Sequence, residues 1–505
     1  MSDPRERFQA TSFYSFALLA LILSSVIANA TPSISLSKKS GPPTSRILVS
    51  GRGFESNVGV DIFFDTKDKA LVVTNGRGEF HDTPIYAPRS ARPSQHWVTA
   101  LERDNDKGAQ KPFLVETNWS QFHFDADGTR LNPYENVLNP KNVGRLELRW
   151  SYATGGPVYY SPAVVNGVVY IGSYDDNLYA LNAHTGAKLW SYRTGSWVSS
   201  SPAIADGVVY FGSSDNNLYA LNASTGAKLW SYTTGGLVWS ELVVADGVVY
   251  FGSTDGNIYA LNARSGAKLW SYSITNPTSY APQVAVADGV AYVGSYAGYF
   301  YAFNAITGQE LWGIPVTTAV LTPPAVANGV VYFGGEGISD SVYGVNASNG
   351  TILWKNGICG ETLQGSPAVA GDHVYVYCDN NVLYALNADT GSELWQYDTG
   401  RNGGAPFFSP AVANGVIYAR VGPYSMGALD ARDGSVLWSY SSDTWFDDPV
   451  VANGVVYVGS VDNSVYTFGL KYGPDEAAPA NRPALTALRP DLSLKVSHRA
   501  TASSR

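Results

Sequence analysis

The sequence predicts an all-β protein in which an eight-bladed β-propeller follows a small β-sandwich. Three observations carry this prediction. A tryptophan recurs about every forty residues through most of the chain, each period holds four short strand-like runs, and the 505 residues include 33 Tyr and 51 Gly. Tyrosine favours strands and glycine favours tight turns. Four strands repeated at such a period are typical of propeller blades.

The composition is that of a globular chain with an acidic balance. Hydrophobic residues make up 45% of the chain and charged residues 15%, which is enough apolar material for a large core. The 33 Lys and Arg against 42 Asp and Glu give a net charge of -9, which argues against a nucleic-acid partner or an anionic membrane surface. Two cysteines and six scattered histidines match no zinc, haem or His-rich pattern, so we expect no metal site.

The first thirty residues have the pattern of a signal peptide. Arg5 and Arg7 precede an apolar stretch over 13–27, and the small residues Ala28 and Ala30 mark a cleavage point. The apolar core is shorter than the ~20 residues that span a bilayer, so an uncleaved membrane anchor is the lesser alternative. No cysteine follows the stretch, so no lipid anchor is expected. The mature chain is then exported, to the periplasm or the extracellular medium, without a membrane span.

Residues 31–117 are predicted to form a small β-sandwich. Alternating runs such as ILVSGRGF and VGVDIFF are separated by turn sequences. The Ser40-Gly41-Pro42-Pro43 turn and the run from Gly51 to Phe54 resemble those of Ig-like IPT/TIG modules, over about 85 residues. This resemblance implies a module that spaces or adheres.

The repeat extends over residues 146–470. Its tryptophans are spaced by 40, 40, 40, 42, 42, 41 and 43 residues, at Trp150, Trp190, Trp230, Trp270, Trp312, Trp354, Trp395 and Trp438. Most units contain an Asn-Gly or Asp-Gly dipeptide that favours a type I′ hairpin. An aspartate also recurs after the second strand, and its recurrence indicates a turn residue rather than a calcium ligand, at Asp175, Asp215, Asp255, Asp379 and Asp462.

The two ends of the repeat predict how the ring closes. Eight units can be counted, beginning at Ser161, Ser201, Ser240, Gln283, Pro323, Ser366, Ser409 and Asp448. The last unit lacks an outer strand, whereas residues 146–153 are an outer strand without the other three. We expect this strand to complete the eighth blade and pair its edge, with seven blades as the alternative. Residues 118–145 are a lead-in expected to wrap the ring, and residues 471–505 are expected to be a disordered tail.

The most specific motif is A-x-N-x-x-T-G-x-x-x-W, which runs from Ala180 to Trp190 and from Ala220 to Trp230. Its glycine suits a strained turn, and its tryptophan can pack between neighbouring blades. The motif resembles the tryptophan-docking motif of the quinoprotein, or PQQ-like, propeller family, over roughly residues 118–470. The resemblance implies that the eight repeat tryptophans are structural docking residues.

Candidate ligand-binding residues break the repeat on one face of the disc, around the central funnel. Glu241 stands where other units have Pro, Asp448 where they have Ser, and Arg420 where they have Gly. Loops of the same class carry four more candidates, Trp239, Arg401, Trp445 and Asp447. Acids, bases and aromatic platforms at one place predict a ligand pocket. The alternative is that these are ordinary solvated loop residues.

The two cysteines are also expected on the funnel face. Cys359 follows the fourth strand of one unit, and Cys378 ends the second strand of the next. Export to an oxidising compartment allows a disulfide between them. Two unpaired thiols are the alternative.

Two classes of function follow from the resemblance. The first is an exported, non-catalytic scaffold or binding propeller that uses its funnel face for a protein, peptide or cell-envelope polymer, as in the outer-membrane assembly lipoproteins of this fold. It has no catalytic residue and no cofactor, although this chain lacks their lipid-bearing cysteine and adds a sandwich. The alternative is a PQQ- and calcium-dependent alcohol or sugar dehydrogenase, with Asp448 and Glu241 as catalytic groups and Trp239 as the stacking ring. Nearly identical, minimal blades and the lack of adjacent cysteines favour the binding class.

Overall fold

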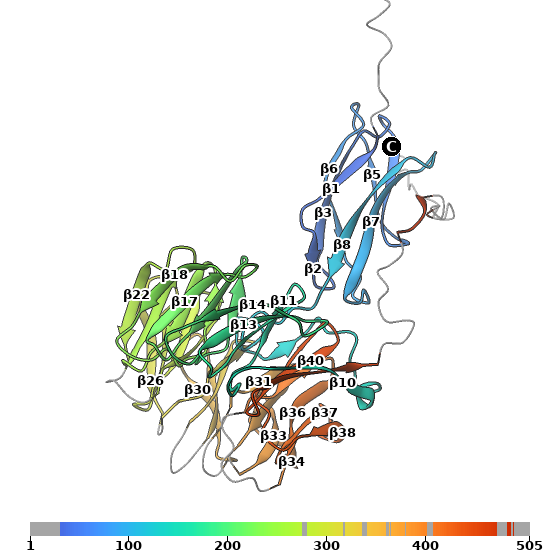
Figure 1. The fold of residues 1–505 in the computed structure, drawn as a ribbon. Helices are drawn as coiled ribbons and strands as arrows, with labels where there is room; N and C mark the ends of the chain where they lie inside the picture. Colours follow the sequence, from blue (N-terminus) through green and yellow to red (C-terminus); the bar gives the residue numbers. More distant parts are fainter. Residues whose placement is uncertain are drawn as a thin grey trace, which may run out of the picture. The chain divides into compact units, whose positions relative to one another are not determined.

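The structure, a computed structural model, consists almost wholly of β-strands (Figure 1). It describes residues 31–274, 280–316, 319–335, 341–359, 363, 365–378, 380–400, 408–471, 482–485 and 488. The expected signal peptide and the candidate Arg401 lie outside the described residues. Two units divide the chain, Met1–Val115 with Ala477–Arg505, and Glu116–Glu476. Among the described helices, none has the length and apolarity needed to cross a membrane.

The N-terminal unit is built from two sheets around one core. The first sheet has the order β1-β3-β6 and the second β2-β8-β7-β4-β5. Alternate side chains from both sheets meet in the core, among them Val49, Ile62, Val98 and Phe113. The strands are β1 (Ser33–Leu36), β2 (Ser40–Gly41), β3 (Arg46–Arg52), β4 (Gly59–Phe64), β5 (Lys67–Val73), β6 (Phe80–Tyr86), β7 (Ser94–Glu102) and β8 (Gly108–Val115).

A short part of the C-terminal tail belongs to this unit. Leu488 is 2% exposed and packs against Phe63 and Leu101. The Gln110 side-chain amide donates a hydrogen bond of 2.8 Å to the Pro483 carbonyl. The prediction of disorder over 471–505 is therefore wrong for residues 482–485 and Leu488, because the leucines of an otherwise polar tail find an apolar site on the sandwich.

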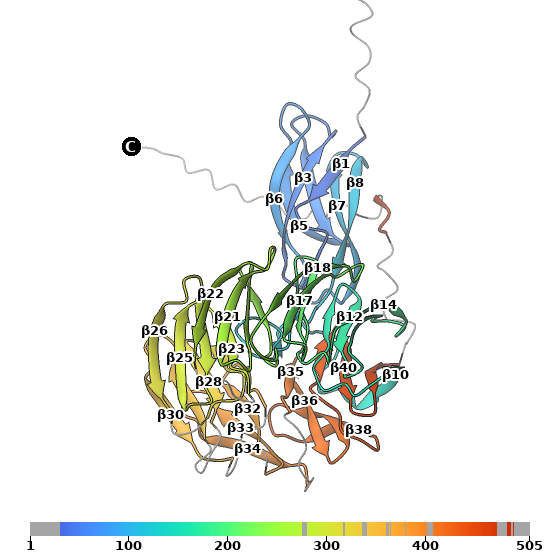
Figure 2. The same cartoon turned by 60° about the vertical axis from the view of Figure 1, so that its left-hand side comes forward.

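The second unit is a propeller with eight antiparallel four-stranded sheets in the described part of the chain, numbered here as blades 1 to 8 in chain order (Figure 2). In the first four blades, the strands follow one another in chain order from the hub outwards. Blade 1 consists of β11 (Ala163–Val165) to β14, blade 2 of β15 to β18, blade 3 of β19 to β22 and blade 4 of β23 to β26. Their other strands are β12 (Val168–Gly172), β13 (Asn177–Asn182), β14 (Lys188–Arg193), β15 (Ala203–Ala205), β16 (Val208–Gly212), β17 (Asn217–Asn222), β18 (Lys228–Thr233), β19 (Val243–Ala245), β20 (Val248–Gly252), β21 (Asn257–Asn262), β22 (Lys268–Ser273), β23 (Gln283–Ala287), β24 (Val290–Gly294), β25 (Tyr299–Asn304) and β26 (Glu310–Pro315).

The remaining blades repeat this plan. Blades 5 to 7 comprise β27 (Ala325–Ala327), β28 (Val330–Gly334), β29 (Val342–Asn346), β30 (Ile352–Asn356), β31 (Ala368–Ala370), β32 (His373–Tyr377), β33 (Val382–Asn387), β34 (Glu393–Asp398), β35 (Ala411–Ala413), β36 (Val416–Gly422), β37 (Ser425–Asp430) and β38 (Val436–Ser441). Blade 8 comprises β39 (Val450–Ala452), β40 (Val455–Ser460), β41 (Ser464–Leu470) and, as its outer strand, β10 (Leu146–Ala153).

The strand β10 closes the ring. It pairs antiparallel with β41, with Leu146 opposite Leu470 and Ala153 opposite Ser464. A strand from before blade 1 thus satisfies the outer edge of the last blade. The short 3-10 helix η1 (Val143–Arg145) leads directly into it.

The repeat tryptophans join each blade to the next. Trp230 Nε1 donates a hydrogen bond of 3.1 Å to the Ala263 carbonyl. A Cβ atom on Gly266 would lie 2.7 Å from the Trp230 ring, and this glycine has a φ of +69°, so only glycine suits the turn. Equivalent indole hydrogen bonds run from Trp150, Trp190, Trp270, Trp312, Trp354, Trp395 and Trp438.

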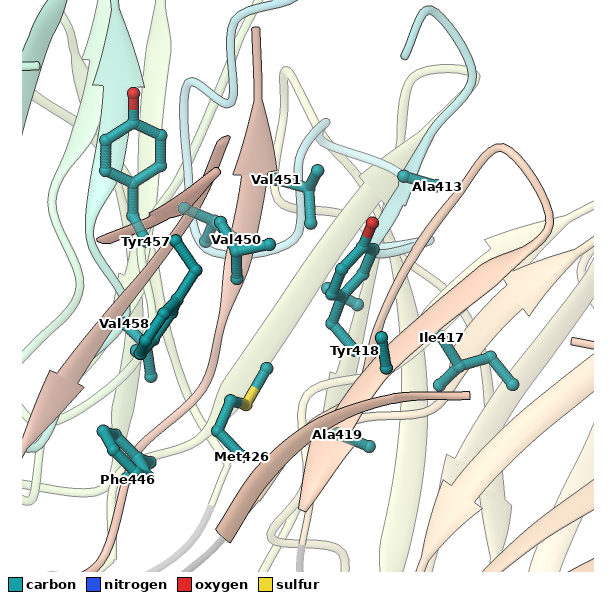
Figure 3. Close-up of a cluster of buried hydrophobic side chains, with 14 of the residues drawn as sticks. Ala413, Ile417, Tyr418, Ala419, Met426, Phe446, Val450, Val451, Tyr457 and Val458 are labelled. Atoms are coloured by element: carbon teal, nitrogen blue, oxygen red, sulfur yellow. The ribbon is translucent and has the colours of Figure 1, made fainter. Parts of the chain in front are cut away.

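Apolar side chains fill the space between the blades. Figure 3 shows this packing where blade 7 meets blade 8, with Tyr418 and Met426 on one side and Val450 and Val458 on the other. The buried side chains of these two blades form one contact cluster, so neighbouring sheets pack directly against each other. The hairpin turns between the first two strands of a blade are of the predicted kind. In blade 3, for example, both Asp246 and Gly247 have a positive φ.

The lead-in does not wrap the ring but passes through its hub. Residues 119–132, here called the hub segment, contact the innermost strand of every blade in turn. The partners in blades 1 to 8 are Val164, Ile204, Val244, Val286, Val326, Val369, Val412 and Val451. Innermost strands leave backbone groups unpaired at the hub, and the hub segment satisfies two of them in blade 1 and at least one in each other blade. Its strand β9 (Leu131–Asn132) extends blade 7 as a parallel neighbour of β35.

Candidate functional site

A cavity of about 370 Å³ lies at the hub of the propeller. Its walls are the segments that lead into the innermost strands, and Phe122 of the hub segment also lines it. The lining residues are Phe122, Tyr159, Tyr160, Tyr174, Trp239, Glu241, Tyr280, Ala281, Gln283, Leu321, Thr322, Pro323, Gly365, Ser366, Ser409, Asp447 and Asp448. Blades far apart in sequence therefore meet in one small site.

The structure brings four of the seven candidate residues into this cavity. Trp239, Glu241, Asp447 and Asp448 line it, whereas Arg420 and Trp445 do not. Arg420 is 2% exposed and points into the body of blades 7 and 8, where its Nε and Nη2 donate to the Phe446 carbonyl.

Glu241 is a buried carboxyl group with one backbone donor. Its side chain is 9% exposed, and its Oε2 accepts a hydrogen bond of 3.0 Å from the Ser201 backbone N–H. Burial raises the pKa of Glu241 to about 8, and repulsion from Asp448 adds to the effect more than the attraction of Arg130 reduces it. This carboxyl group therefore carries a proton at neutral pH when the cavity is empty of counter-ions.

Two consecutive aspartates form the facing acidic wall. Asp448 Oδ1 accepts the Ser409 N–H at 2.5 Å, and Asp447 Oδ1 accepts the Asp448 N–H at 2.7 Å. Burial raises the pKa of Asp447 well above its usual value, and repulsion from Asp448 raises it further. Burial also raises the pKa of Asp448, against the attraction of Arg130.

The two arginines near the cavity are held from behind by backbone carbonyls. Arg130 is completely buried and donates to the carbonyls of Phe122, Ser409, Pro410 and Pro449 at 2.8 to 3.1 Å. Its Nη1 lies 3.9 Å from Asp448 Oδ2. Among the described lining residues there is no lysine or arginine. The cavity is thus lined by carboxyl groups, whereas the guanidinium groups of the two nearby arginines donate hydrogen bonds to backbone carbonyls of the propeller.

Aromatic rings line the cavity on the side of blades 1, 3 and 4. Tyr159 lies 4.7 Å from Tyr174, which stacks on Trp197 at 4.6 Å with an interplanar angle of 6°. Tyr280 stacks on Tyr296 at 5.5 Å. Trp197, Tyr280 and Tyr296 are 45%, 41% and 47% exposed, so the aromatic surface continues outward from the cavity.

Sequence reasoning missed five of these aromatic lining residues, Phe122, Tyr159, Tyr160, Tyr174 and Tyr280. A usable signal existed for some of them. Unit 1 has Tyr159-Tyr160 where unit 2 has Ser199-Ser200, and it has Tyr174 where unit 2 has Ser214. Tyr159 and Tyr160 depart from the repeat in the same class of loop as Glu241, and Tyr174 departs from it in the turn between β12 and β13.

The recurrent aspartates are turn residues. Asp255 Oδ1 accepts the Asn257 N–H at 3.0 Å, and its Oδ2 accepts the Gly235 N–H and the Tyr259 hydroxyl at 2.8 and 2.7 Å. Asp175 and Asp215 make the same contacts, and Asp379 lies outside the described residues. Within the described part of the chain, no group of His, Cys, Asp and Glu is arranged to hold a metal ion.

Cys359 and Cys378 form a disulfide, with Cα atoms 5.1 Å apart. Cys359 lies beyond β30 of blade 5, and Cys378 directly follows β32 of blade 6. Both are buried. The bond therefore joins two neighbouring blades near the strand ends that face the funnel.

The ring of four-stranded blades, its docking tryptophans and its hub cavity define a quinoprotein-type β-propeller. The chain belongs to the family described as outer membrane protein assembly factor BamB, which it matches over residues 135–282, 279–355, 338–445 and 409–474.

Individual relatives agree with this family. The chain is 41% identical over 68 residues to the outer membrane protein assembly factor BamB of Shewanella oneidensis, a match that spans 14% of this chain and 16% of that protein. BamB from Moraxella catarrhalis has a similar structure, with a TM-score of 0.55, 18% identity, and coverage of 64% of this chain and 99% of that one. The quinohemoprotein alcohol dehydrogenase of Comamonas testosteroni is also similar, with a TM-score of 0.58, 16% identity, and coverage of 71% of this chain and 82% of that one. Likeness at such identities concerns the fold alone.

The described lining of the hub cavity offers no lysine or arginine to the quinone cofactor of the dehydrogenases. Pyrroloquinoline quinone is a planar polycarboxylate, which needs cationic or hydrogen-bond-donating partners. The lining has neutral donors such as Ser366 and Gln283 beside the three carboxyl groups of Glu241, Asp447 and Asp448. An anionic cofactor would raise the pKa of these carboxyl groups further, because it would lie near them in a site shielded from water.

Proposed function

We propose that this chain is an exported, non-catalytic propeller that binds a protein, peptide or cell-envelope polymer at its hub. The observation that carries this proposal is the hub cavity, where aromatic rings from blades 1, 3 and 4 and the carboxyl groups of Glu241, Asp447 and Asp448 line one site. Apolar walls with a few convergent polar groups are the usual composition of a binding site. Export rests on the signal-peptide pattern of the first thirty residues, and the compartment is then the periplasm or the extracellular medium.

The family supports a protein partner. Its description, outer membrane protein assembly factor, is a role that depends on contacts with other proteins. Exposed aromatic residues such as Trp197 and Tyr280 suit a protein partner, because aromatic side chains are enriched at protein interfaces. The N-terminal sandwich is proposed to be an Ig-like module of the IPT/TIG kind that spaces or adheres.

The second candidate is a PQQ- and calcium-dependent dehydrogenase. It is favoured only by the similarity of fold to the quinohemoprotein alcohol dehydrogenase. The hub argues against it, because its described lining residues include three carboxyl groups and no lysine or arginine that would pair with the carboxylates of the cofactor.

Capture from a native envelope extract tests the binding function. The intact protein and the Trp239→Ala variant are immobilised in equal amounts, with Tyr86→Ala as the control, since Tyr86 is 55% exposed on the N-terminal unit. We expect the wild type and the control to retain the same partner and Trp239→Ala to lose it. Equal retention by all three proteins would show that the hub cavity is not the binding site. Equal melting temperatures exclude unfolding as the cause of a loss.

A further inference from the structure

The buried acids at the hub outnumber the buried cations. Three carboxyl groups belong to the cavity, those of Glu241, Asp447 and Asp448, and two guanidinium groups lie behind them, those of Arg130 and Arg420. Arg130 is 3.9 Å from Asp448, and the strongest attraction on Arg420 comes from Asp447. No cation among the described residues forms an ion pair with Glu241, on which the repulsion by Asp448 is stronger than the attraction by Arg130. A positive charge in the cavity would balance the ionised form of Glu241.

The aromatic wall suits a positive charge as well. Cations are attracted to the faces of tryptophan and tyrosine rings within about 6 Å, and cages of such rings recognise organic ammonium groups. Trp239 lines the cavity two residues before Glu241, and its indole is fixed by a hydrogen bond of 2.9 Å from Nε1 to Ser214 Oγ. The cavity therefore combines a carboxyl group with an oriented ring at one place.

The size of the cavity and the surface around it identify the kind of molecule. A volume of about 370 Å³ is at the small end for ligand sites, so it holds one side chain rather than a polymer segment. The stacked pairs Tyr174 with Trp197 and Tyr280 with Tyr296 continue the contact surface outside. A ligand that uses both must carry its cation on a larger body.

We propose that the hub cavity binds the ammonium or guanidinium group of a lysine or arginine side chain of a partner protein, with Glu241 as its carboxylate partner and Trp239 against its stem. This inference rests on the proposed binding function and names its ligand chemistry. The aliphatic stem of such a side chain packs on apolar walls while its charged end reaches the acids.

Binding of the cation is coupled to release of a proton. The groups that face Glu241 are Asp447, Asp448, Arg130 and Tyr160, with Arg420 behind Asp447. Because burial raises the pKa of Glu241 to about 8, the free cavity holds this carboxyl group protonated at pH 7. A bound cation stabilises the ionised form and so expels the proton. Affinity is then expected to rise between pH 6.5 and pH 8.5.

Calorimetric titration of the intact protein tests the inference. The probes are acetyl-Ala-Lys-Ala-amide, the same peptide with norleucine in place of lysine, and n-butylamine as a free amine. We expect saturable binding of the lysine peptide, binding of the other two at least about tenfold weaker, and a heat at pH 7 that depends on the ionisation enthalpy of the buffer. Glu241→Gln is expected to weaken binding of the lysine peptide at least about tenfold and to abolish the dependence of the binding heat on the buffer. Glu393→Gln on β34, where the side chain is exposed, is the matched control.

Three outcomes would overturn the inference. These are no saturable binding of the lysine peptide up to about 10 mM, equal affinity for the lysine and norleucine peptides, or tighter binding of n-butylamine than of the peptide. If any of them occurs while Trp239→Ala still abolishes capture of the envelope partner, the binding function stands and only the cationic ligand is wrong. If Glu241→Gln fails to fold, the buffer-dependent heat and the norleucine comparison on the wild-type protein decide.

Discussion

Single residues at the hub behave as their burial dictates. Arg130 is buried, and its guanidinium group donates hydrogen bonds to four backbone carbonyls. Glu241 is similarly buried with a single backbone donor, so its carboxyl group holds a proton to higher pH. The same physical cause, removal from water, thus accompanies a structural anchor in one case and a protonated carboxyl group, which we propose as the binding group, in the other.

The first prediction concerns the pH dependence of stability. The pKa of Glu241 is about 8 in the folded chain and about 4.5 in an unfolded one, so between these values the folded state binds the extra proton. Stability therefore falls as pH rises through this window, by up to about 1.4 kcal/mol per pH unit, and levels off above it. Glu241→Gln removes this contribution. The free energy of unfolding of this variant minus that of the wild type, both measured by urea titration, is expected to increase from pH 5 to pH 8. A difference that stays constant with pH would contradict the raised pKa of Glu241.

The second prediction concerns Arg130. Arg130→Met keeps the length of the side chain but leaves four carbonyls without their donor, so we expect the free energy of unfolding to fall by about 3 to 5 kcal/mol. Arg145→Met, in the exposed part of η1, is the control and is expected to change it by less than about 0.5 kcal/mol. Equal effects of the two substitutions in urea titrations would mean that the hub segment is not anchored by Arg130.

Residues that break the repeat in the segment before an innermost strand could be placed at the hub cavity from the sequence. Glu241, Asp447 and Asp448 are such residues. Arg420 breaks the repeat too, but it lies within β36, where successive side chains alternate between the two faces of the sheet, and the sequence does not say which of them reach the cavity. The tyrosines were missed because tyrosine is abundant in every unit, so a tyrosine at a new loop position is only a weak signal of a site.

At the scale of strands and segments, repetition decides what the sequence can predict. The four strand-like runs, the hairpin dipeptides and the docking tryptophans recur in each unit, and the structure has them in the expected order. The hub segment occurs once and has no periodic pattern. Its path follows from unpaired groups of eight separate strands, which become neighbours only when the ring forms. Local sequence therefore gave no indication of it.

The third prediction tests the docking tryptophans. Trp230→Ala removes a ring that packs on Gly266 and donates to the Ala263 carbonyl, so we expect a loss of about 2 to 4 kcal/mol in the free energy of unfolding. Leu229→Ala on the same strand is the control, because Leu229 is 51% exposed and its truncation should cost less than about 0.5 kcal/mol. Urea unfolding of both variants makes the comparison, and a loss no larger for Trp230→Ala would refute the docking role.

The fourth prediction concerns the link between blades 5 and 6. The disulfide encloses a sequence separation of 19 residues, so its reduction is expected to lower the free energy of unfolding by about 3 kcal/mol. A thiol assay of the denatured, unreduced protein should find no free thiol. The double variant Cys359→Ser, Cys378→Ser should unfold alike with and without reductant. Two free thiols per chain would contradict the pairing.

At the scale of the whole molecule, the propeller is a closed ring held at three levels. The tryptophans join neighbouring blades, β10 completes blade 8, and the hub segment ties every innermost strand. None of these devices requires a bound group, so the ring is a stable scaffold whose hub is free to carry different chemistry. In this chain the hub carries acids and aromatic rings, which is the basis for assigning it a binding role.

The most direct test of this account is titration of the purified mature protein with pyrroloquinoline quinone and calcium, followed by absorbance and by dye reduction with an alcohol or glucose. We expect no saturable quinone spectrum and no substrate-dependent dye reduction, because the described lining of the hub has carboxyl groups and no lysine or arginine. A bound quinone spectrum together with dye reduction that Asp448→Ala abolishes would contradict it and establish the dehydrogenase instead.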